Sequence, residues 1–265
     1  MAAVYFLIAL LATTIGAMTG MGGGVIIKPV LDMLHHYDAA TVGVLSSLTV
    51  LIMSLVSVLK QIRQKAKIIP KIVIPLALGS VLGGNLGNRM FSVLLRSLGD
   101  SKTASKGVTV VQNTVLALLI IVVFLYMLRK DSIRSFHFEG ILPSLLTGVF
   151  LGVCSSFLGI GGGPINVALL ILLFSFDTKT AAVCSIFTIL FAQVSKAGDI
   201  LLSPGGLSSY DLSMLLPMAI GAVAGGFIGS KLNKELPERT VDKMFNAVQI
   251  LVFVICLLNI VQNLP

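Results

Sequence analysis

Apolar residues form eight long stretches along the chain, separated by short polar segments. They cover residues 3–34, 42–59, 68–90, 108–128, 141–176, 181–202, 212–232 and 241–261. Six of them have the length of about 17–25 residues that one membrane-spanning helix needs. The first and the fifth are too long for one span, and glycines interrupt each of them near its middle. The pattern predicts an all-α polytopic membrane protein with six full spans and two broken segments.

The two glycine runs reveal an internal repeat. Residues 20–24, Gly-Met-Gly-Gly-Gly, recur 139 positions later as residues 159–163, Gly-Ile-Gly-Gly-Gly. That offset, or one of 142, also pairs Asp38 with Asp177, Ser46 with Ser185, Thr49 with Thr188, Pro75 with Pro217, Gly79 with Gly221, Gly83 with Gly225 and Gly87 with Gly229. The glycines spaced by four predict close helix packing faces. We predict a first repeat over residues 1–130, an inter-repeat loop over 131–139 and a second repeat over 140–265.

The positions of Lys and Arg favour inverted repeats. If all eight stretches cross the membrane once, the repeats are parallel and the 19 basic residues divide nine to ten. If the two broken stretches re-enter, leaving on the side where they entered, the repeats are inverted and 13 of the 19 basic residues share one side. Cytoplasmic loops are enriched in such residues. Residues 3–18 would also form a helix of only about 24 Å, short of the ~30 Å hydrocarbon core. We therefore predict two inverted repeats, each a glycine-broken hairpin plus three transmembrane helices.

Composition agrees with a membrane protein and excludes several other classes. The chain is 56% hydrophobic and 11% charged, with a mean hydropathy of +1.01, whereas soluble domains carry roughly 25% charged residues. The formal charge of +8 does not predict a nucleic-acid partner, because the basic residues fall mostly between the apolar stretches. The three cysteines lie inside apolar stretches without a metal-ligand spacing, so we expect neither a disulfide framework nor a metal site, and no cofactor.

The two triple glycines are the first candidates for substrate binding. Non-helical backbone at membrane depth is tolerated only inside protein or beside a water-filled cavity. A half-helix that begins after such a break points its free N–H groups and its positive dipole end at the break, and broken segments at matching positions mark transporter sites. The predicted binding residues are Gly22, Gly23, Gly24, Gly161, Gly162 and Gly163. The alternative is that these glycines serve only close helix packing.

Polar side chains near the breaks extend this candidate site. The hydroxyl pairs Ser46 with Thr49 and Ser185 with Thr188 are spaced i, i+3, so each pair shares one helix face and could donate to an oxyanion. Further candidates, without an amide at the equivalent position of the other repeat, are Asn166 and Gln193. Lys28 is a candidate electrostatic residue, since ionisable residues in spans are functional suspects. The alternatives are that the hydroxyls bond their own helices and that Lys28 pairs with Asp32.

The glycine-rich breaks at 19–24 and 158–164 resemble the hallmark of the TauE/SafE sulfite-exporter family of permeases. The small-residue run 79–87 and its repeat are similar to that family's pattern as well. The resemblance implies transport of small sulfur-containing anions, such as sulfite, sulfoacetate or other organosulfonates, or thiosulfate. It also implies a multi-pass protein of the bacterial or archaeal inner membrane.

Together these observations predict a secondary transporter that works by alternating access. Its expected partners are a small anionic substrate, the lipid bilayer and a coupling proton or sodium ion, and a homodimer is compatible with the sequence. One alternative is an anion channel with the same midplane site. A less favoured alternative is an intramembrane enzyme, because the spans offer no cluster of His, Asp or Glu. We expect no enzymatic activity.

Overall fold

The computed structural model is an all-helical bundle. It describes residues 1–98, 102–160, 162–203 and 205–263, and all of their side chains except those of 94–98 and 102–105. The described helices, in chain order, are α1 (Ala2–Thr19), α2 (Gly24–Leu34), α3 (Ala39–Arg63), α4 (Pro70–Leu98), α5 (Lys102–Leu128), α6 (Ile141–Leu158), α7 (Pro164–Phe174), α8 (Thr178–Leu202), the 3₁₀ turn η1 (Gly206–Ser209), α9 (Leu215–Glu235) and α10 (Glu238–Asn263).

Both long apolar stretches break at their glycines. Helix α1 ends at Gly20 with φ 79°, and α6 ends at Gly159 with φ 66°. A side chain disfavours this left-handed backbone, so glycine is the usual residue at such helix ends. Helix α7 then starts at Pro164, whose missing N–H costs nothing at a first helical position. The bounds of α1 and α3 recur 139 residues later as those of α6 and α8.

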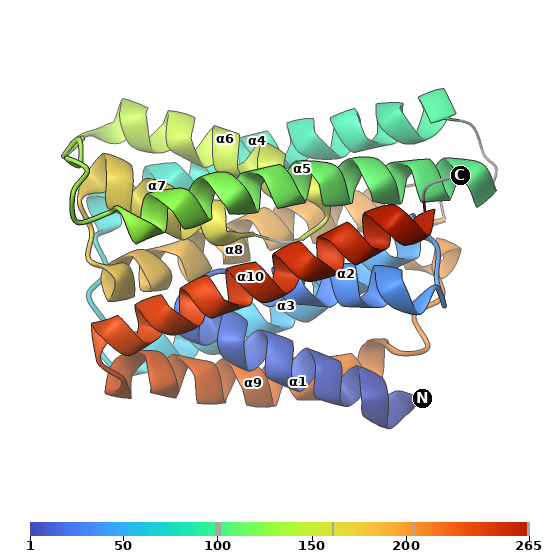
Figure 1. Cartoon of the computed structure of the whole chain (residues 1–265), viewed down its shortest axis with the longest axis horizontal. Helices are drawn as coiled ribbons and strands as arrows, with labels where there is room; N and C mark the ends of the chain where they lie inside the picture. The colour runs from blue at the N-terminus through green and yellow to red at the C-terminus, as the bar shows by residue number, and fades with distance from the viewer. Residues whose placement is uncertain (99–101, 161, 204, 264–265) are drawn as a thin grey trace.

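Each broken segment returns to the end of the molecule where it starts. The Tyr5 hydroxyl lies 2.9 Å from His36 Nδ1 and so joins the start of α1 to the end of α2. The Phe136 N–H donates to Leu172 O at 2.8 Å, joining the segment before α6 to the end of α7. Helix α2 points to the end where the N-terminus lies, and α7 points to the opposite end (Figure 1). The two hairpins therefore open at opposite ends of the bundle.

We call these ends the terminal end, with residue 1 and loops 35–38 and 205–214, and the basic end, with loops 64–69, 129–140, 175–177 and 236–237. Six helices run from one end to the other: α3, α4, α5, α8, α9 and α10. Helices α1 and α6 have 18 residues each, two more than the predicted 3–18 segment.

The first helix of each hairpin packs against the other half of the chain. Helix α6 lies along α4, and α1 lies along α9. The predicted glycine faces make these contacts: a Cβ on Gly83 would overlap the carbonyl oxygen of Val149, and a Cβ on Gly225 would overlap the Thr13 hydroxyl. The prediction that these glycines are packing faces is confirmed. Close approach of this kind replaces the hydrophobic driving force that lipid-embedded helices lack.

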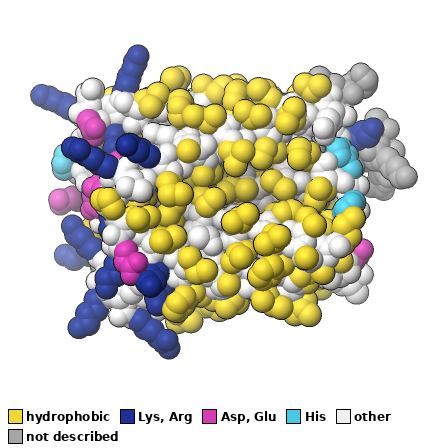
Figure 2. Space-filling view, turned by 60° about the horizontal axis from the view of Figure 1, so that its bottom comes forward, with side chains coloured by type: hydrophobic (Ala, Val, Ile, Leu, Met, Phe, Trp, Pro, Cys, Tyr) yellow, Lys and Arg dark blue, Asp and Glu magenta, His cyan; other side chains and the backbone are white. Residues whose placement is uncertain are grey.

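The surface is that of a multi-pass membrane protein. Seven helices in the described part of the chain are long and apolar enough to cross a bilayer: α1, α3, α5 from Lys106 onward, α6, α8, α9 and α10. Figure 2 shows apolar side chains across the middle of the visible face and Lys and Arg side chains gathered at the basic end. Such an apolar surface needs lipid as its solvent.

Candidate functional site

The two glycine breaks meet inside the bundle. Gly24, the first residue of α2, packs directly on Ile160, since a Cβ at Gly24 would overlap the Ile160 carbonyl oxygen. Gly20 packs equally closely on Ala182 of α8. The backbone that faces the start of α2 is therefore the second break itself, and at Gly24 and Gly20 these contacts leave no room for a ligand.

The triple glycines line little open space in this conformation. Gly22, Gly23 and Gly24 are buried and border none of the described cavities. Gly162 and Gly163 border a void of about 10 Å³, the size of a single water site. The predicted site residue Gly161 lies outside the described residues. The larger space lies beside these breaks.

A polar cavity of about 190 Å³ reaches from the terminal end to the second break. At its outer rim lie Ser203 and Tyr210, and at its inner end lie Gly159 and Lys28. Helices α2, α3, α4, α5, α6 and α8 contribute to its walls. It has room for several water molecules, which suits a small ion.

Lys196 of α8 is a buried lysine of this cavity without a partner among the described residues. Its side chain is 8% exposed and forms no hydrogen bond or ion pair with any described residue. The nearby Asp199 instead accepts a hydrogen bond from the Asn88 amide at 2.7 Å. With its amide nitrogen oriented toward Asp199, Asn85 also donates to this carboxylate at 2.8 Å. A buried ammonium without a counterion is costly. An anion that binds beside Lys196 would stabilise its charged form, against the opposing charge of Asp199, which lines the same cavity.

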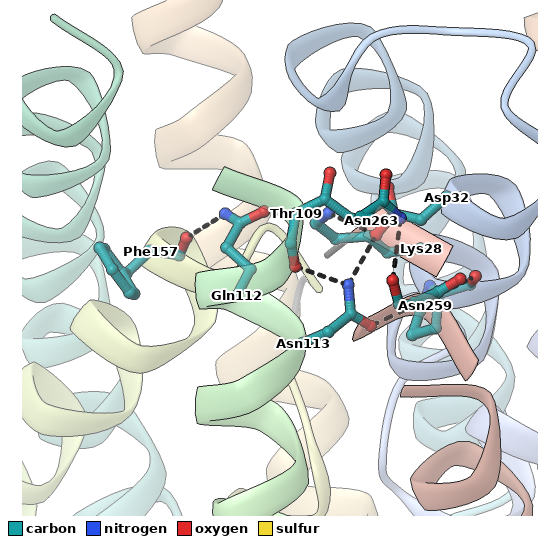
Figure 3. Close-up of polar contacts among 9 residues, drawn as sticks. Lys28, Asp32, Thr109, Gln112, Asn113, Phe157, Asn259 and Asn263 are labelled. Carbon is teal, nitrogen blue, oxygen red and sulfur yellow. Dashed lines mark hydrogen bonds and ion pairs between the residues drawn. The ribbon is translucent and has the colours of Figure 1, made fainter. Parts of the chain in front are cut away.

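Two uncharged groups in the cavity wall also lack partners. The Ser156 hydroxyl and the Oε1 atom of Gln112 are buried and unbonded within the described part of the chain. The Gln112 side chain is fixed because its Nε2 donates to Phe157 O at 2.7 Å (Figure 3). A free hydroxyl can turn to donate to an oxyanion. Buried polar atoms of this kind ordinarily have partners, so they point to a missing ligand or water.

Comparison with known proteins places the chain in a family. A family model described as "Sulfite exporter TauE/SafE" matches residues 5–255. The chain belongs to this family. It is also similar to the probable membrane transporter protein YunE of Bacillus subtilis, with 26% identity over 92% of each chain. It is 24% identical to the probable membrane transporter protein MJ0441 of Methanocaldococcus jannaschii, over 88% of this chain and 87% of that one. No solved structure matches. The protein is a membrane transporter.

Lys28 of this TauE/SafE protein borders the cavity but already has a partner. Its Nζ lies 2.9 Å from Asp32 Oδ2, and both side chains are buried. Asn113 of α5 donates to the same carboxylate oxygen at 3.4 Å and accepts from Asn259 of α10 at 3.2 Å (Figure 3). Asn259 also donates to Pro29 O at 2.8 Å. The alternative interpretation from the sequence, a Lys28–Asp32 pair, is the arrangement observed.

The predicted hydroxyls behave differently from one another. Thr49 and Thr188 each donate to the carbonyl four residues earlier, as residues inside a helix often do. Ser185 donates to Gly20 O at 2.6 Å, across the contact between α8 and the first break. Its repeat counterpart Ser46 is buried beside Gly24 and has no partner among the described residues. None of the four borders the polar cavity.

The predicted amides are buried away from the cavity. Asn166 lies at the small void beside Gly163, and its Oδ1 is unbonded in the described structure. Both amide atoms of Gln193 are likewise buried and unbonded there. A role of either residue in binding stays a prediction.

Sequence reasoning missed the cavity residues Lys196, Gln112 and Ser156. Lys196 stands six residues before the end of its apolar stretch, a position from which a lysine side chain is expected to reach the membrane interface. The signal that could have found it is that an ionisable residue inside an apolar stretch is a functional suspect wherever it stands. Gln112 and Ser156 are ordinary polar residues of their helices and carry no such signal.

Proposed function

We propose that this TauE/SafE protein is a secondary transporter of small sulfur-containing anions, such as sulfite, thiosulfate, sulfoacetate or another short organosulfonate. The observation that carries the proposal is Lys196, a buried cation without a counterion among the described residues, at the wall of a cavity of about 190 Å³. The anion would bind between Lys196 and the inner end of the cavity at Lys28 and Gly159.

The free energy of binding in the cavity beside Lys196 favours a small oxyanion. An anion that leaves water must recover its hydration energy from the protein. Two opposite unit charges at 4 Å attract by about 4 kcal/mol at an effective dielectric constant of 20. The Ser156 hydroxyl adds a donor without adding charge. The volume admits a small anion with a few waters.

Transport would proceed by alternating access between two inverted halves. The two hairpins open at opposite ends of the bundle, as inverted repeats require. Because 13 of the 19 Lys and Arg fall in or next to the loops of the basic end, that end would face the cytoplasm of a bacterium or archaeon. Gly22, Gly23 and Gly24 do not line the cavity and would reach the anion only when the contact between the breaks rearranges. A proton or sodium gradient would supply the energy.

The test compares Lys196→Met with Lys243→Met, a control that removes an exposed lysine of α10 far from the cavity. We expect sulfite, thiosulfate, sulfate or methanesulfonate to raise the unfolding temperature of the purified parent chain and of the control. At 100 times the dissociation constant, a ligand stabilises by about 2.7 kcal/mol. The Lys196→Met variant should lose this stabilisation while remaining folded.

Counterflow in proteoliposomes then tests transport itself. A carrier shows saturable uptake that is accelerated by anion on the opposite side, whereas a channel with the same site shows neither. The proposal is wrong if no anion in the set stabilises the parent chain, or if Lys196→Met responds to the anions as the parent does.

A further inference from the structure

A second hollow of about 190 Å³ lies at the basic end of the molecule. Its walls come from the end of α3, the loop after it, the start of α8 and the end of α9. It does not connect with the polar cavity described above, since the two share no lining residue.

The internal repeat relates this hollow to the polar cavity. Ala40 and Val44 line the cavity, and their counterparts at an offset of 139, Lys179 and Val183, line the hollow. The same correspondence, at an offset of 139 or 142, pairs Ile200 with Gln61, Ser203 with Gln64, Phe91 with Asn233 and Ser92 with Lys234. Because α3 and α8 run antiparallel, the two spaces lie at opposite ends, about 36 Å apart along α3 from residue 40 to residue 64.

The two spaces differ in depth. The cavity reaches Gly159, the first glycine of the second break, whereas the hollow ends at Val183 and does not reach Gly20, the equivalent glycine. At Gly20 the chain is closely packed on Ala182. At Gly159 the equivalent backbone neighbour is Gly43, and a Cβ on Gly159 would stand 3.7 Å from the Gly43 Cα and 3.3 Å from Cε of the Lys28 side chain. One end is therefore closed at its break and the other is open.

Two hydrogen bonds accompany the closed end. Ser185 Oγ donates to Gly20 O at 2.6 Å, and Asn233 Nδ2 donates to Met18 O at 2.6 Å. Both bonds tie the end of α1 to other helices. At the open end the two bonds are not repeated: the Ser46 hydroxyl is unbonded within the described residues, and Phe91 stands where Asn233 would be. Phe157 O, the counterpart of Met18 O, accepts instead from Gln112 Nε2 of α5 at 2.7 Å.

The chemistry of the hollow suits the same ligand class. Lys65, Lys67, Lys179 and Lys234 border it, and its described lining includes no carboxylate. Lys179 is bound to backbone carbonyls of residues 234 and 236, and the other three lysines are exposed. Gln61 is only 2% exposed, and both its amide atoms are unbonded in the described structure. A basic, partly unsatisfied recess attracts small anions.

We propose that this basic hollow is the second mouth of the anion path and that the Ser185–Gly20 and Asn233–Met18 hydrogen bonds hold it shut. Transport exchanges the two closures: these bonds break as Gly20 leaves Ala182, and Ser46 then donates to Gly159 O as the cavity at the terminal end closes. This inference rests on the proposed transport function and names the elements that alternate.

Two cysteines introduced at positions related by the repeat test this proposal. In a chain with Cys154, Cys184 and Cys256 replaced by alanine, Val44→Cys reports the cavity and Val183→Cys reports the hollow. Their reaction rates with a charged, membrane-impermeant methanethiosulfonate are measured without any anion, with and without Ser185→Ala. Since a hydrogen bond contributes about 0.5–1.5 kcal/mol, Ser185→Ala should raise the Val183→Cys rate about three- to tenfold and leave the Val44→Cys rate equal or lower. Ser144→Ala is the control, because that buried serine bonds only within its own helix turn.

The outcomes separate this inference from the function on which it rests. An unchanged Val183→Cys rate, or an equal rise at both cysteines, overturns the second mouth, the latter because it indicates general loosening. If Ser185→Ala does not yield folded protein, Asn233→Ala makes the same test. In proteoliposomes the reagent should reach the two cysteines from opposite sides. If anions stabilise the protein and counterflow is observed while the Val183→Cys rate does not respond to Ser185→Ala, the transport proposal stands and only the proposal of a second mouth is wrong.

Discussion

The two buried lysines of the cavity should respond in opposite ways to loss of their charge. Lys28 lies 2.9 Å from Asp32, and the two side chains are 3% and 2% exposed. Lys28→Met leaves the Asp32 carboxylate buried, with only a 3.4 Å contact from Asn113. Breaking a buried ion pair by removing one partner costs about 3–5 kcal/mol, or roughly 10 °C in unfolding temperature for a chain of this length. Lys196→Met removes a cation that has no described counterion, so it should be neutral or stabilising.

The double variant Lys28→Met/Asp32→Asn isolates the pair. It removes both charges and keeps an oxygen that can accept from Asn113, so most of the loss in Lys28→Met should be recovered. The chain has no Trp, which leaves a thiol-reactive dye as the convenient probe of unfolding. Cys184 and Cys256 are fully buried in the folded protein and become reactive when it opens. Equal destabilisation by Lys28→Met and Lys196→Met, or a double variant as unstable as Lys28→Met, would refute the assignment of the two lysines.

Two further predictions concern backbone positions. Gly24→Ala should destabilise the protein by several kcal/mol in the same unfolding assay, because its Cβ would overlap the Ile160 carbonyl. The control Gly43→Ala, whose Cβ meets nothing within 4 Å, should be neutral or stabilise the protein by up to about 1 kcal/mol. Similar losses of stability in both variants would contradict the contact between the breaks. Asp38 and Asp177 cap α3 and α8 by accepting the Thr41 and Thr180 N–H groups at 2.9 Å, so alanine at either should cost about 1 kcal/mol. Burial alone would raise the pKa of Asp177, but hydrogen bonds from Thr180 lower it below its usual value. The contribution of the Asp177 cap should therefore be present at neutral pH and be lost as the pH falls through that lowered pKa; a cost of Asp177→Ala that is the same at pH 7 and pH 3 would rule this out.

The amino-acid sequence by itself determined the parts of the fold that depend on local physics. Apolar length decides which segments can cross a bilayer, and glycine decides where a buried helix can end with positive φ. The breaks at Gly20 and Gly159 and the glycine packing faces of α4 and α9 were accordingly predictable. The Lys28–Asp32 pair was open to prediction for the same reason, since residues four apart on one helix are neighbours.

Only the tertiary structure decided where open space remains. Gly24 packs on Ile160, which is 136 residues away in the chain. The triple glycine that the sequence predicted as a ligand contact is therefore packed against protein. Lys196, placed near an interface by its sequence position, is buried because six helices close around one cavity. Empty volume is a property of several packed surfaces at once, and no single segment carries it. Which of two similar halves is open and which is shut depends on contacts such as Ser185 with Gly20, which join segments far apart in the chain.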